Sequence, residues 1–84
     1  MRQIDFKYKT SGDITKMDGT PIPPDEPLVL FRAKDKLLPA LLVQYRQLCQ
    51  DAGSPQQQVE AVDELIKSVE TWQEQNQDKV KIPD

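Results

Sequence analysis

Histidine is absent from this 84-residue chain, and cysteine occurs only once. Without histidine, the chain lacks the most common general base and metal ligand near neutral pH. Cys49 has no second cysteine or histidine to work with, which excludes zinc motifs, Cys–His catalysis and an internal disulfide. The three glycines are scattered and form no phosphate-binding loop. We therefore expect no enzyme activity, no metal site and no cofactor.

The chain also lacks a basic patch and a long apolar run. Its formal net charge is −3, and this charge is uneven: residues 1–42 carry seven basic and six acidic groups, whereas residues 43–84 carry four and eight. Binding to nucleic acid through phosphates needs clustered lysine and arginine, so we do not expect nucleic acid as a partner. No apolar run approaches the roughly 20 residues of a membrane span, and the N-terminus alternates polar and apolar residues instead of forming a signal peptide. A lone cysteine fits a reducing cytoplasm.

The first half of the chain has the features of short β-strands. "IDFKYK" alternates apolar and polar residues, which is typical of a half-buried strand, and Asp18-Gly19 is a turn signal. Prolines between Pro21 and Pro27 favour an extended connector. "LVLFR", from Leu28 to Arg32, is apolar on both faces and predicts a second strand. Ile14–Met17 could add a very short third strand.

The second half predicts two helices, Asp35–Ala52 and Ser54 to about Asn76, joined by a link so short that they form an antiparallel hairpin. Asp35 suits an N-cap and Gly53 the residue after a helix end. "SPQQ" matches a capping box. At 100° per residue, apolar side chains gather on one arc of each helix, about 140° wide on the first. These residues are Leu37, Leu38, Leu41, Leu42, Tyr45, Leu48, Cys49 and Ala52, then Val59, Val62, Leu65, Ile66, Val69 and Trp72.

These elements predict an α+β fold in the order β-β-α-α, with a small antiparallel sheet packed on the helical hairpin. The sheet is built from Gln3–Lys9 and Leu28–Arg32. We expect one domain spanning residues 1–84, with a β-rich and proline-rich part at 1–34, the helical hairpin at 35–77 and a tail at 78–84 that packs nearby or adds to a sheet edge.

Three groups of residues are candidates for binding. The doubly apolar strand offers a surface for a partner or for a second copy, through Leu28, Val29, Leu30 and Phe31. The second helix has an acidic outer face that could dock on a basic enzyme surface, through Glu60, Glu64, Glu70 and Glu74. Arg32 and Lys34 precede the first helix and could bind a small anion or nucleotide at its N-terminus. For each group the alternative is purely structural: a covered strand, a solvated helix face and an ordinary helix start.

The stretch "DGTPIPPDEPLVLFRAKDKLLP", followed by "YRQLC", "AG", a late tryptophan and a terminal "KIPD", resembles a group of small uncharacterised proteins of bacteria and their phages. The resemblance covers most of the chain but implies no activity, cofactor or site residue. It favours an accessory protein linked to a phage or another mobile element. The leading hypothesis is a non-enzymatic protein–protein interaction module, and a homodimer is one form it could take. The alternatives are a phage-type inhibitor that uses the acidic helix, and an anion or nucleotide binder.

Overall fold

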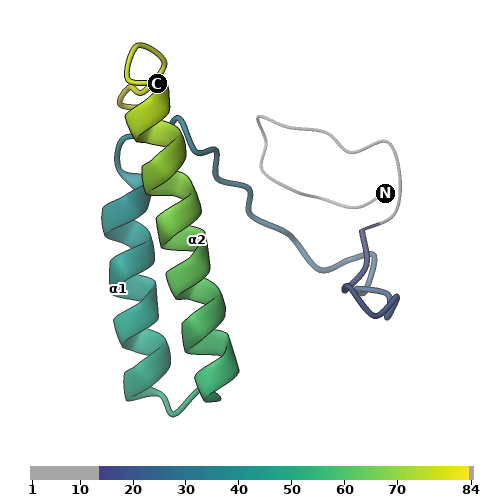
Figure 1. Ribbon diagram of the computed structural model, residues 1–84. Coiled ribbons are helices and arrows are strands. Elements are labelled where there is room, and N and C mark those ends of the chain that lie inside the picture. The colour runs from purple at the N-terminus through teal and green to yellow at the C-terminus, as the bar shows by residue number, and fades with distance from the viewer. Residues whose placement is uncertain (1–13, 84) are drawn as a thin grey trace. The chain divides into compact units, whose positions relative to one another are not determined.

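The computed structural model describes residues 14–83 and contains two helices, α1 (Leu38–Asp51) and α2 (Gln56–Gln75). They lie side by side and are joined by a short turn, so they run antiparallel (Figure 1). The predicted helical hairpin is therefore confirmed. The predicted α+β class is wrong, because residues 14–83 form no β-strand and no sheet.

The strand expected at Leu28–Arg32 is the main error. Those residues lie in an irregular segment before α1, and no backbone pairing joins them to another segment of residues 14–83. An apolar run becomes a strand only when a neighbour satisfies its backbone N–H and C=O groups. The other expected strand, Gln3–Lys9, lies outside the described residues.

Residues 15–21 form a tight loop at the predicted Asp18-Gly19 turn. A single antiparallel bridge joins Thr15 and Pro21 at its base, in place of the short strand expected at Ile14–Met17. Gly19 has a φ of +88°, a conformation that glycine adopts without a steric penalty. The Asp18 carboxylate accepts a hydrogen bond from the Thr20 backbone N–H at 2.9 Å. Hydrogen bonds from Thr20 lower the pKa of Asp18 below its ordinary value, because they stabilise the charged form.

Helix α1 starts three residues later than the sequence suggests. Leu37, not Asp35, occupies the N-cap position, and Asp35 instead accepts the Leu37 N–H on its side-chain Oδ1 at 2.8 Å. Pro39 lies in the first turn, as predicted, where no intrahelical donor is lost. The helix ends in a Schellman motif around Gly53, whose φ is +79°. In this motif the Ser54 N–H donates to the Cys49 carbonyl and the Gly53 N–H to the Gln50 carbonyl.

Helix α2 begins after Pro55, which is its N-cap residue and makes no side-chain cap. The predicted capping box at Ser54 is therefore wrong, and the fixed φ of Pro55 starts the helix instead. At the other end, the Asn76 side-chain amide donates to the Trp72 carbonyl at 2.9 Å. This bond satisfies one of the carbonyls that a helix end leaves without an intrahelical partner.

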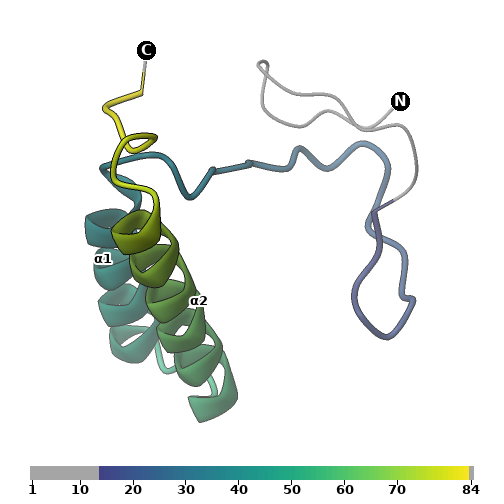
Figure 2. The same ribbon diagram turned by 45° about the horizontal axis from the view of Figure 1, so that its top comes forward.

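The segment after α2 returns to the segment before α1 (Figure 2). Lys81 pairs with this segment in a single parallel bridge: its N–H donates to the Lys34 carbonyl, and its carbonyl accepts the Lys36 N–H, both at 3.0 Å. The Gln73 side-chain amide reinforces the same place by donating to the carbonyls of Ala33 and Asp35, both at 2.9 Å. The tail thus makes one bridge and does not form a strand.

The chain divides into two units between Leu30 and Phe31. The second unit contains both helices and the bridge at Lys81. Among the described residues, the buried side chains all belong to the two helices: Leu38, Cys49, Val59, Val62 and Val69. The core of the hairpin is therefore a single narrow row of contacts between α1 and α2, and the prediction of one domain over the whole chain stays a prediction.

Candidate functional site

Helix α1 buries only part of its apolar arc. Leu38 and Cys49 are buried against α2, and Leu42 is half-buried. The side chains at one edge of the arc stay largely exposed, with exposed fractions between 42% and 64%. They are Leu37, Leu41, Tyr45 and Leu48. Their spacing of four, four and three residues places them on one line along the helix.

Helix α2 repeats this arrangement. Val62 and Val69 are buried in the contact with α1, whereas Leu65 is 54% exposed. Ala61 is also exposed, and Trp72 is half-buried. Ala61, Leu65 and Trp72 are four and seven residues apart, so they share one side of α2 about a quarter turn away from the buried valines.

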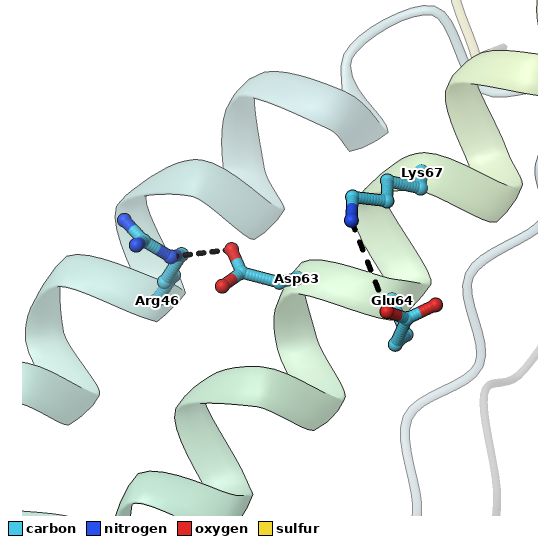
Figure 3. A network of polar contacts seen from close by, with 4 residues as sticks. All are labelled: Arg46, Asp63, Glu64 and Lys67. Atoms are coloured by element: carbon cyan, nitrogen blue, oxygen red, sulfur yellow. Dashed lines mark ion pairs between the residues drawn. The ribbon is translucent and has the colours of Figure 1, made fainter.

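The two exposed apolar lines lie on the same side of the hairpin. On each helix, viewed from its own N-terminus, the exposed apolar side chains lie about 90° around the axis from the buried ones, and the direction of rotation is the same for both helices. When two helices run antiparallel, the same direction of rotation leads to the same side of the pair. Arg46 and Asp63 are rotated away from the buried side chains in the opposite direction, so both lie on the other side of the hairpin. They form an ion pair between the helices, which agrees with this geometry (Figure 3). We call the shared side the apolar face, formed by Leu37, Leu41, Tyr45, Leu48, Ala61 and Leu65.

The apolar face is continuous along the hairpin and carries no charge. Arg46 lies opposite Asp63. Counting along antiparallel helices from this pair puts Leu48 at the level of Ala61 and Leu37 at the level of Trp72. The polar positions in the same sector of α2 are uncharged, Gln58 and Ser68. A surface of this kind loses little by leaving water, because it has no ionised group to desolvate.

The opposite side of the hairpin is acidic, as the sequence predicts. Glu60, Glu64, Glu70 and Glu74 are all exposed on α2. Lys67 lies among them, 3.9 Å from Glu64 (Figure 3). On this side a shallow groove runs between the start of α1 and the end of α2, with Pro39, Ala40, Thr71 and Gln77 among its lining residues. Docking of the acidic face on a basic partner stays a prediction.

Three of the four residues predicted as a partner surface are exposed. Val29, Leu30 and Phe31 have exposed fractions of 72%, 44% and 52%, and Leu28 is half-buried. Because they do not form a strand, their side chains are not sorted onto two faces of a sheet. They remain candidates as an apolar segment, without the defined geometry that the sequence suggested.

The candidate anion-binding residues lie in the segment before α1. Arg32 is exposed and Lys34 is half-buried. The Asp35 carboxylate already accepts the Leu37 N–H, so a bound anion would meet a negative charge there. This charge is unfavourable for an anion, and anion or nucleotide binding at Arg32 and Lys34 stays a prediction.

The part of the chain that the structure describes contains no candidate metal site. Within residues 14–83, no three cysteine or carboxylate side chains lie together in a way that could hold a metal ion. The Cys49 thiol is buried between the helices, as predicted from its position on the apolar arc. Neither of the two helices in residues 14–83 is long and apolar enough to cross a membrane.

The residues of the apolar face were predicted from the sequence as apolar, but with a different role. All but Ala61 were placed on the apolar arcs and assigned to a core shared with a sheet. The structure describes no sheet in residues 14–83, and the outer edges of the arcs are exposed. The signal was the width of the arc on the first helix, about 140°, which is more than one neighbouring helix covers.

Comparison with known proteins identifies no relative. No protein-family model, no curated protein and no solved structure matches the chain. The resemblance to small bacterial and phage proteins thus rests on the quoted residues alone.

Proposed function

We propose that this protein is a small non-enzymatic interaction module that binds another protein surface through the apolar face of its helical hairpin. The observation that carries the proposal is the continuous, charge-free row of exposed leucines together with Tyr45. The lone cysteine supports a reducing cytoplasm as the setting.

Burial of this face would be favourable. Removing apolar surface from water contributes about 25 cal/mol per Å². A leucine that is half exposed therefore has a large part of its side-chain transfer energy still to gain. Tyrosine adds a large rigid ring and a hydroxyl, a combination that is enriched where protein interfaces concentrate their binding energy. The acidic groups on the opposite side would keep the complex in solution and away from nonspecific contacts.

Site-specific photo-crosslinking tests the proposal in the cells that normally make the protein. Tyr45 is replaced by p-benzoylphenylalanine, an aromatic residue of similar shape that reacts on illumination with whatever lies against it. We expect a discrete crosslinked product, whose second component is identified by mass spectrometry.

Val43 provides the matched control. It is 51% exposed, close to the 49% of Tyr45, but it lies on the other side of α1. The same photo-reactive residue at position 43 should give no discrete product. Equal products from both positions, or no product from position 45, would contradict the proposal.

A further inference from the structure

We infer that the apolar face is covered by a second copy of this chain, so that two helical hairpins form a dimeric four-helix bundle. This inference rests on the proposed function and specifies its partner. It is carried by three properties of the described residues: the absence of charge on the face, the size of the face and the thin core of a single hairpin.

Charge does not oppose a second copy at the apolar face. The chain has a net charge of −3, and two identical acidic chains repel each other wherever their glutamates approach. The apolar face avoids this cost because the acidic residues of α2 lie on the other side. Its polar members are serine and glutamine, and a glutamine amide both donates and accepts hydrogen bonds, so it can pair with its own symmetry copy. A basic partner would instead select the acidic side.

Size also fits. Helix α2 has 20 residues and is therefore about 30 Å long. Helix α1 has 14 residues and is about 21 Å long. Each helix presents a strip about 10 Å wide, since neighbouring axes lie about 10 Å apart. The two strips cover roughly 500 Å², so two copies would together bury about 1,000 Å², the size that a specific protein interface should reach.

A four-helix bundle would also supply the larger apolar core that a single hairpin lacks. The buried side chains of the two helices form one row between α1 and α2. Helical units of this length, with 14 and 20 residues, rarely bury enough surface to be stable alone, and oligomerisation is a common remedy. Stacking two hairpins by a two-fold axis makes the facing helices antiparallel and turns the exposed leucines into the central layer of a bundle core.

Sedimentation equilibrium of the full chain from micromolar to near-millimolar concentrations tests the inference. We expect a dimer that dissociates on dilution. Leu41→Glu and Leu65→Glu place a buried charge in the proposed interface and should each weaken association by about thirtyfold or more. Val43→Glu adds the same charge to an exposed position on the opposite side and should leave the dissociation constant unchanged.

The outcomes separate the inference from the proposed function. The inference is supported if the two leucine variants weaken dimerisation and Val43→Glu does not. If Leu41→Glu loses its helical circular dichroism, sedimentation of the unmodified protein on dilution still shows whether it dimerises. A strict monomer overturns the inference; the proposed function survives if that monomer binds the dye ANS and Leu65→Glu removes the binding. A strict monomer without ANS binding overturns both. A dimer that all three variants weaken equally also overturns the assignment to this face.

Discussion

Gln73 has a structural role that its residue type does not reveal. Its side-chain NH₂ group donates to the carbonyls of Ala33 and Asp35, and it thereby fixes the segment before α1 against the end of α2. Both partners are carbonyl oxygens, which only accept, so the amide must present its nitrogen to them. The Lys34–Lys81–Lys36 pairing depends on the same segment staying in place.

Removing this amide should loosen one end of the hairpin. We expect Gln73→Ala to lower the free energy of unfolding by about 1 kcal/mol, because two carbonyls lose a donor in a half-buried place where water can partly replace it. Chemical denaturation measures this change. Hydrogen exchange of the Lys36 and Lys81 amides should accelerate in the same variant.

Gln75→Ala is the control, since Gln75 is exposed on the same helix and two residues away. It should change neither quantity. An unchanged exchange rate at Lys36 in Gln73→Ala would mean that the bridge to Lys81 is held by other contacts.

Both helices follow from the apolar periodicity of the sequence, but their boundaries depend on tertiary contacts. Asp35 is a good N-cap residue by type, yet its backbone pairs with Lys81 and its carbonyl also accepts a bond from Gln73. These contacts hold Asp35 outside α1, and no local pattern around it could predict them. The end of α1 was predictable, because Gly53 alone supplies the left-handed conformation that a Schellman motif requires.

The strand prediction failed for a related reason. Leu28–Arg32 has strand-like composition, but a strand is a pairing between segments and composition does not specify the partner. The nearby prolines remove N–H donors, and the β-bridges within residues 14–83 are the single ones at Thr15 and at Asp35. Periodicity thus predicts a helix better than a strand, since a helix satisfies its backbone within one segment.

Gly53 gives a test at the level of the hairpin turn. Its φ of +79° is costly for a residue with a Cβ, although a Cβ built there would meet no atom within 4 Å. The penalty of Gly53→Ala is therefore conformational, and we expect it to destabilise the hairpin by about 1 kcal/mol in thermal or chemical unfolding. Gly53→Asn should cost less, because asparagine tolerates this conformation better. Equal stability of the two variants would contradict this explanation.

For the whole molecule, the exposed apolar face and the narrow core are two aspects of one property. The apolar arcs of the sequence are wide enough to pack against more than one neighbouring element. The hairpin buries only the row of side chains between its two helices. The width of the arcs was visible in the sequence, but nothing in the sequence specified an element that would cover them. Composition alone therefore could not distinguish a core with a sheet from a core with a second hairpin.

Coupling between folding and association gives the last prediction. If two hairpins share one core, the folded state is a dimer and its stability depends on protein concentration by mass action. Each tenfold increase in concentration adds about 1.4 kcal/mol to the stability of the dimer. For so small a protein this should raise the midpoint of thermal unfolding by several degrees. Circular dichroism melts over a hundredfold range of concentration measure the slope, and Val43→Glu should preserve it. A midpoint that is the same at every concentration would mean that each hairpin folds alone, and that its thin core is stable without the second copy.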